Sequence, residues 1–259
     1  LPLLLTLFSW RQVTLISVVP LILATLALWY YNPMYLRVET PPAKNIMAGI
    51  SIILKNKYFW PIVTIAALWN GGQFGFLTWL PSFARDVLGH NLGLTGSMPA
   101  LMSLGVVFGG VIISKYVSEQ QKTRVFILGS IATCVIQIGF ALASSELIGI
   151  LWIASFSLGS LFAIYFISVP IIASRVPSSH GGAAIGTMNT INFLPAFFVS
   201  WLMGVILDKR SVPSANNYVS TRLGYRDAFL LPGCLFWLAI LVSITYLGLL
   251  RRSNSKNTK

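Results

Sequence analysis

Long apolar segments without charged residues recur along the chain, and they constrain its fold more than any other feature. Seven such segments have about the 20 residues that a helix needs to cross a bilayer. The 259 residues are 56% hydrophobic and only 9% charged, against roughly 25% charged in an ordinary soluble domain. Because a backbone in lipid must satisfy its own hydrogen bonds, the sequence predicts an all-α, polytopic transmembrane helical bundle of seven spans.

The predicted spans divide the chain into four parts. Residues 1–31 hold the end of one span and a complete span, and residues 32–57 form a cytoplasmic central loop. Residues 58–250 form a six-helix bundle, and residues 251–259 form a cytoplasmic basic tail. Because the chain opens on Leu1 in an apolar stretch too short to span, we expect it to be a fragment of a longer polypeptide. The spans are expected at about residues 13–31, 59–84, 96–116, 125–143, 147–173, 183–207 and 228–250, with an amphipathic surface segment near residues 46–54.

Lysine and arginine predict how the bundle is oriented. Of the 18 Lys and Arg residues, twelve fall on one side of the predicted membrane and six on the other. The side with twelve is predicted to be cytoplasmic, so this segment starts outside and ends inside a plasma or inner membrane. Orientation and lipid phosphate account for the net charge of +12, so no nucleic acid is expected as a partner.

The second predicted span carries the strongest functional signal. Its middle reads Trp69-Asn70-Gly71-Gly72-Gln73, which puts two amides and two glycines at mid-membrane depth. Amides in hydrocarbon need hydrogen-bond partners or water. One interpretation is helix–helix packing, in which the glycines allow close approach. The other is a cavity face on a helix softened at the glycine pair, with Trp69, Asn70 and Gln73 contacting a substrate.

Three more polar side chains are candidates for the same cavity. Asn189 and Asn192 lie three residues apart in the sixth span and therefore share one helix face. Tyr165 in the fifth span is a phenol at depth, and a buried hydroxyl needs a partner. Each of the three is interpreted either as a packing hydrogen bond or as a substrate contact.

Charged residues fall outside the spans or at their ends. Arg85 and Asp86 follow the second span and are expected to form an ion pair at the outer surface or gate. His90, in the same loop, is expected to be solvated. Since no Lys, Arg, His or carboxylate is placed at mid-membrane, the segment predicts no intramembrane proton relay or voltage sensor of its own.

The sequence favours no covalent chemistry. It lacks the G-x-S-x-G, P-loop and dinucleotide-binding motifs and has no paired carboxylates, so an enzyme is not expected. Cys134 and Cys234 lie in apolar runs without ligand-type spacing. They are interpreted as small buried hydrophobic residues, so neither a metal site nor a cofactor is expected.

Two segments resemble a known family. Residues 78–89, TWLPSFARDVLG, resemble the end of helix seven in the anion:cation symporter branch of the major facilitator superfamily, and a helix rich in glycine (Gly105, Gly109, Gly110) follows. In one departure, Lys115–Tyr116 stands where the loop after helix eight usually has an Asp–Arg pair, which weakens the case for a charge relay there. Residues 181–208 resemble the superfamily's helix eleven pattern at Gly182, Ala184, Gly186, Asn189, Gly204 and Asp208.

The resemblance implies helices six to twelve of a twelve-helix transporter, with residues 1–31 as the end of helix five and helix six. Helices seven, eight, ten and eleven would line a central cavity that the N-terminal half of the same polypeptide completes. The implied function is secondary active transport of a small polar metabolite by alternating access, coupled to protons or sodium. The implied substrate is an organic anion such as a sugar acid, carboxylate or organophosphate. The alternative is a neutral or zwitterionic nutrient, such as an amino acid or sugar, or a uniporter.

Two other interpretations of a seven-span chain compete with this one. A retinal protein needs a lysine in its last span, and a G-protein-coupled receptor usually has N-P-x-x-Y there; residues 228–250 contain neither. The second competing interpretation is a half-transporter that dimerises. The start on Leu1 instead favours a fragment of a longer polypeptide.

Overall fold

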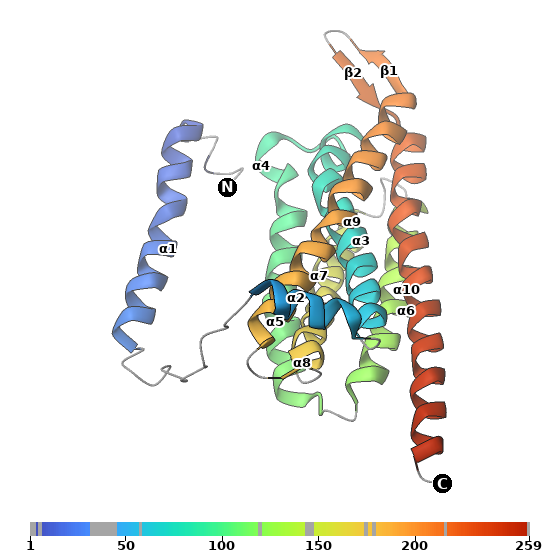
Figure 1. Cartoon of the computed structure of the whole chain (residues 1–259). Helices are drawn as coiled ribbons and strands as arrows, with labels where there is room; N and C mark the ends of the chain where they lie inside the picture. The colour runs from blue at the N-terminus through green and yellow to red at the C-terminus, as the bar shows by residue number, and fades with distance from the viewer. Residues whose placement is uncertain are drawn as a thin grey trace.

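The computed structural model describes residue 4 and residues 7–31, 46–56, 59–118, 121–142, 148–173, 176–177, 180–214 and 217–257. The fold is an all-α bundle with a small hairpin at one end (Figure 1). Most of the predicted central loop, residues 32–45, lies outside the described residues. In chain order the elements are α1 (Trp10–Tyr31), α2 (Ile46–Lys55), α3 (Phe59–Asp86), α4 (Leu92–Thr95), α5 (Ser97–Tyr116), α6 (Lys122–Leu142), α7 (Ile148–Phe162), the 3₁₀ helix η3 (Ala163–Ile167), α8 (Ser168–Ala173), α9 (Gly181–Lys209), β1 (Ser211–Ser214), β2 (Asn217–Ser220) and α10 (Arg222–Asn257).

The membrane-spanning character predicted from the sequence is confirmed. Within the described residues, six helical segments are long and apolar enough to cross a membrane; they correspond to α1, α5, α6, α7 to α8, α9 and α10. The remaining predicted span, the second along the chain, is α3. It has 28 residues, but its amides, glycines and tryptophans make it less apolar than the other six. α3 lies at the centre of the bundle, where it packs against α9 and α10 (Figure 1).

The glycines of α3 permit close helix packing, and the helix is not softened at them. α3 is one uninterrupted α-helix through Gly71 and Gly72. A Cβ on Gly71 would lie 2.8 Å from the Cβ of Pro195 in α9, and one on Gly72 would lie 2.8 Å from the Phe236 ring in α10. Both glycines are covered by neighbouring helices, which favours the packing interpretation of this pair.

Two of the three glycines in the glycine-rich helix α5 allow its backbone to contact a neighbouring helix. A Cβ on Gly105 would collide with the backbone carbonyl of Phe156, and one on Gly109 would collide with that of Ser160. From α7, Gly159 approaches the carbonyl of Met102 in the same way. α5 and α7 therefore lie in backbone contact, whereas Gly110 faces open space.

The fifth predicted span is broken into three pieces. α7 ends at Phe162, η3 follows, and α8 resumes an α-helix at Ser168. Pro170 explains the break, because it has no N–H for the carbonyl four residues back and its ring clashes with that carbonyl. The carbonyl in question belongs to Phe166, inside η3.

Two elements lie outside the tightly packed bundle. Among the described side chains of α1, Val13 alone is buried, and Figure 1 shows the helix standing apart from the others. α2 crosses one end of the bundle with Ile53 buried and Met47 exposed, as expected for an amphipathic surface segment.

The connection between α9 and α10 forms a hairpin that was not predicted from the sequence. β1 and β2 pair antiparallel, with Ser211 opposite Ser220 and Ser214 opposite Asn217. At the other end of the chain, α10 continues helically through most of the predicted tail to Asn257. The last two residues lie outside the described residues.

Candidate functional site

A layer of buried amides joins α3 to three other helices. Asn70 Nδ2 donates to the backbone carbonyl of Asn192 in α9 at 3.0 Å. Gln73 Nε2 donates to the carbonyl of Leu158 in α7 at 3.0 Å, and Gln137 Nε2 of α6 donates to Gln73 Oε1 at 3.2 Å. All four side chains are buried. This geometry favours the packing interpretation for Asn70 and Gln73, since their donors are already used between helices.

Trp69 is buried where α3 packs against α6 and α10. Its ring packs against Phe126 of α6 and Phe236 of α10, with ring centroids 4.9 and 5.6 Å away. The side chain is fully buried, and its Nε1 has no hydrogen-bond partner among the described residues. Direct substrate contact by Trp69 has no support in this geometry and stays a prediction.

Tyr165 and Asn192 are brought together as a pair. Asn192 Nδ2 donates to the Tyr165 hydroxyl at 2.8 Å, and both side chains are buried. Tyr165 belongs to η3, where its carbonyl accepts from Ser168 Oγ at 2.7 Å. Since Asn70 binds the carbonyl of the same Asn192, one connected set of hydrogen bonds links α3, α9 and the 3₁₀ segment.

An aromatic cluster lies beside this pair. Phe74 of α3 contacts Phe162 of α7 and Phe193 of α9, with centroids 6.1 and 5.8 Å away. Phe162 stacks on Tyr165 at 5.5 Å. Phe74 and Phe193 were not singled out from the sequence. Phe74 lies four residues before Thr78, so the two share one face of α3. This spacing was the sequence signal that could have identified Phe74.

Asn189 differs from the other five predicted substrate contacts because it is exposed. It lies one turn before Phe193, which is 56% exposed, on the side of α9 that adjoins Phe74. Thr78 of α3 is also exposed, and its hydroxyl lies 3.4 Å from that of Ser200 in α9. We call the surface formed by Phe74, Thr78, Asn189, Phe193 and Ser200 the open face.

The predicted ion pair forms at the end of α3. Arg85 Nε lies 2.7 Å from Asp86 Oδ1, and the hydroxyl of the buried Tyr225 donates to Asp86 Oδ2 at 2.7 Å. Asp86 is 9% exposed, whereas Arg85 is 59% exposed. Asp86 therefore ties α3 to α10, and the Arg85 guanidinium projects from the same end of the bundle. Its role as a gate stays a prediction.

Two sequence interpretations need correction. His90 is buried rather than solvated, with its ring 6.4 Å from that of Trp152 in α7, because the loop after α3 folds back over α7. Cys134 is buried as expected, but Cys234 is exposed, on a face of α10 that the neighbouring helices leave uncovered. Within the described part of the chain, no group of three His, Cys, Asp or Glu residues is placed to hold a metal ion.

A bundle of apolar membrane-length helices, packed through glycines and buried amides, is the architecture of a polytopic integral membrane protein. A sequence profile of the Major Facilitator Superfamily matches residues 1–200, so the chain belongs to that superfamily. Membership points to membrane transport rather than to enzyme catalysis.

One curated relative was found. The cyanate transport protein CynX of Escherichia coli (strain K12) is 26% identical to this chain over 162 residues, which are 62% of the chain and 40% of the relative. The match therefore covers less than half the length of that relative.

Proposed function

We propose that the chain is the C-terminal half of a secondary active transporter that moves a small polar metabolite by alternating access. Family membership supports transport, and the open face carries the rest of the proposal. It presents the amide of Asn189 and the hydroxyl of Thr78, and its Phe74 contacts Phe162, which stacks on the buried Tyr165. Substrate sites in such folds lie near the midplane between two repeats, so the open face would form one wall of the cavity.

The substrate class that we favour is a small anion. The relative is named for the transport of cyanate, which is an anion, and the organic anions expected from the sequence belong to the same class. Among the described residues the open face itself carries no cation. The charge that holds an anion, and the carboxylate that couples transport to protons or sodium, would therefore come from helices of the other half. A neutral substrate is the alternative that this lack of charge favours.

The proposed topology follows from the loop charges. Residues 1–31 would hold the end of helix five and helix six, residues 58–250 the six-helix bundle, and residues 32–57 and 251–259 would lie in the cytoplasm. The end of the bundle that bears the Arg85–Asp86 pair and the β1–β2 hairpin would face outside. This orientation rests on the excess of Lys and Arg at the other end.

The proposal is tested with the complete polypeptide reconstituted into liposomes. Uptake of radiolabelled cyanate, gluconate, succinate and glycerol 3-phosphate is measured beside uptake of alanine and glucose, with and without a proton or sodium gradient. Gradient-dependent uptake of at least one anion is the expected result. Uptake of alanine or glucose alone would favour the neutral alternative, and no gradient dependence would indicate a uniporter.

Asn189 and Gln73 are expected to respond differently to alanine. Asn189→Ala should lower uptake about tenfold at unchanged membrane abundance, the factor for one lost hydrogen bond of about 1.4 kcal/mol. Gln73→Ala should instead lower abundance, because it leaves the buried Gln137 amide without its acceptor. Uptake is divided by the amount of protein in the membrane, and Thr190→Ala, at an exposed neighbour of Asn189, is the control. Uptake that follows abundance in the Asn189 variant would make that residue a packing residue.

Arg85 is expected to attract anions to the outer mouth. Arg85→Gln should slow anion uptake several-fold at low ionic strength, and the difference should vanish in high salt, because exposed charges are screened. Arg226→Gln is the matched control, since Arg226 is also exposed and likewise pairs with the next residue, Asp227, at 2.9 Å, but belongs to α10 rather than α3. An Arg85 effect independent of salt would point to a direct contact or a structural role instead.

A further inference from the structure

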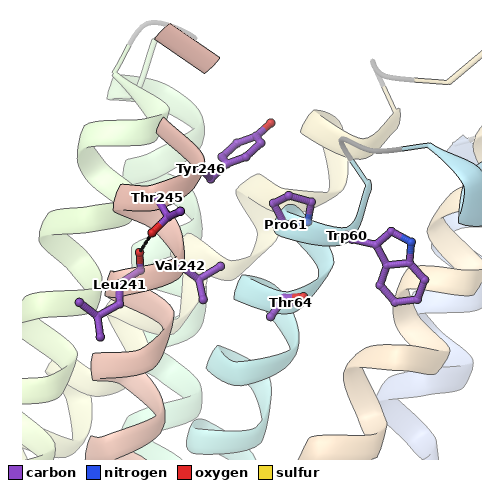
Figure 2. A pocket seen from close by; sticks show the side chains of 7 residues that line it. All are labelled: Trp60, Pro61, Thr64, Leu241, Val242, Thr245 and Tyr246. Atoms are coloured by element: carbon purple, nitrogen blue, oxygen red, sulfur yellow. Dashed lines mark hydrogen bonds between the residues drawn. The ribbon is translucent and has the colours of Figure 1, made fainter. Parts of the chain in front are cut away.

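A groove between α3 and α10 lies apart from the open face. Its lining comes from the first turns of α3 and from the part of α10 before the C-terminal tail. Figure 2 shows Val242 and Pro61 between the two helices, with Leu241 and Trp60 pointing outward on either side. Its volume is about 380 Å³, within the size range of small-ligand sites. The lining residues are Trp60, Pro61, Thr64, Leu241, Val242, Thr245 and Tyr246.

Two of the polar side chains in this lining already have hydrogen-bond partners within the protein. Trp60 Nε1 donates to the carbonyl of Leu54 at 2.9 Å, and Thr245 Oγ1 donates to the carbonyl of Leu241 at 2.9 Å. Tyr246 packs its ring toward the cluster that includes Ile53 of α2. What remains is mainly ring and aliphatic surface, and a polar metabolite would lose its hydration there without gaining partners. The lining therefore suits a hydrocarbon chain.

The position of the groove identifies where that chain would come from. α10 is long and apolar enough to cross a membrane, and α3 is predicted from the sequence to cross it beside α10. Trp60 of α3 is 47% exposed and Leu241 of α10 is 58% exposed. α2 lies beside this end of the bundle with its apolar residues Met47 and Ile52 exposed, as in helices that lie in the headgroup region. An exposed tryptophan at that depth is typical of the membrane interface. The groove thus opens to one leaflet at headgroup level.

Basic residues at the same end of the bundle favour a lipid with an anionic headgroup. Lys55 follows directly after Leu54, whose carbonyl holds Trp60, and its side chain is exposed. The sequence adds Lys57 before α3 and Arg251 and Arg252 after the groove-lining part of α10. No Asp or Glu occurs between residues 41 and 85 or after Asp227. A lysine or arginine near a bilayer surface favours anionic lipids.

We propose that the groove between α3 and α10 binds one phospholipid with an anionic headgroup, its acyl chain between Pro61 and Val242 and its phosphate near Lys55. A lipid held there fills the space between α3, which contributes to the open face, and α10, which packs against α3. The bound lipid thereby couples the composition of this leaflet to the packing of α3 against α10.

The test is native mass spectrometry of the complete protein, purified from its own membranes in mild detergent and titrated with phosphatidylglycerol or with phosphatidylcholine of the same acyl chains. We expect one bound phosphatidylglycerol and weaker retention of phosphatidylcholine. Val242→Trp, which fills the groove, should remove the bound lipid. Lys55→Glu should lower phosphatidylglycerol retention roughly fivefold, the factor for one basic residue at an anionic surface, and leave phosphatidylcholine unchanged.

Two matched controls separate the groove from general lipid contact. Val135→Trp changes an exposed valine of α6, and Lys115→Glu changes an exposed lysine at the end of α5. Both controls should retain the lipid, and thermal melting of each variant verifies that it folds. The proposal is overturned if Val242→Trp retains the lipid, if Val135→Trp loses it equally, or if the two lipids bind alike. Loss in Lys55→Glu with retention in Val242→Trp would indicate a headgroup patch on α2 and also overturn it.

Discussion

Replacing Gly109 with valine is expected to prevent the folded protein from accumulating in the membrane. A Cβ at this position would collide with the backbone carbonyl of Ser160 in α7, and a backbone atom cannot rotate away as a flexible side chain can. Overpacking costs about 1–3 kcal/mol where side chains can adjust, so a collision with backbone should cost at least that. Since about 1–2 kcal/mol already changes cellular abundance several-fold, we expect a loss of about tenfold or more.

The control for this change is the next residue along the chain. Gly110 is in the same helix, and a Cβ there would meet nothing within 4 Å. Gly110→Val therefore adds the same side chain at the same depth without the collision, and Gly139→Val in α6 repeats the control in a second helix. Abundance and melting temperature are measured by fluorescence-detected size exclusion. Equal loss in the Gly109 and Gly110 variants would mean that α5 and α7 are not in backbone contact.

The glycine face of α5 could be predicted because its signal is local. Small residues four apart in an apolar helix mark a surface that another helix can approach closely, whatever that helix is. The partner was not predictable from this spacing. Gly159 on α7 completes the contact, and it lies fifty residues further along the chain, where nothing in the sequence links it to Gly105 or Gly109.

The amides of α3 show the limit of the same reasoning. Spacing places Asn70 and Gln73 on one face, but it does not say whether that face meets another helix or an aqueous cavity. The structure shows partners on α9, α7 and α6, which favours the packing interpretation. Asn189, by contrast, is exposed, whereas Asn192 in the same helix is buried and bonded to Tyr165. Exposure depends on helices that are distant in sequence, which helical periodicity does not report.

Replacing Pro170 with alanine is expected to trap the transporter in one conformation. Alanine restores an N–H for the carbonyl of Phe166 and removes the ring that clashes with it, a difference of about 3 kcal/mol in favour of a continuous helix. That energy changes an equilibrium constant by roughly a hundredfold. A 3₁₀ stretch inside a helix often marks a hinge, and this one carries Tyr165, which is bonded to Asn192 of α9. Straightening the segment would therefore rotate Tyr165 away from Asn192 and oppose the relative motion of the two helices.

Accessibility of Asn189 measures this effect without knowledge of the substrate. In a Cys234→Ser background, Asn189→Cys is labelled with a membrane-impermeant maleimide from either side of the membrane. With Pro170 present, alternating access predicts labelling from both sides; with Pro170→Ala, labelling should persist from one side and fall about tenfold or more from the other. Pro81→Ala is the control, because α3 runs through Pro81 as a continuous helix. Unchanged labelling from both sides in the Pro170 variant would show that the break in this span is a fixed kink, and the moving parts would then have to be sought between the two halves of the transporter.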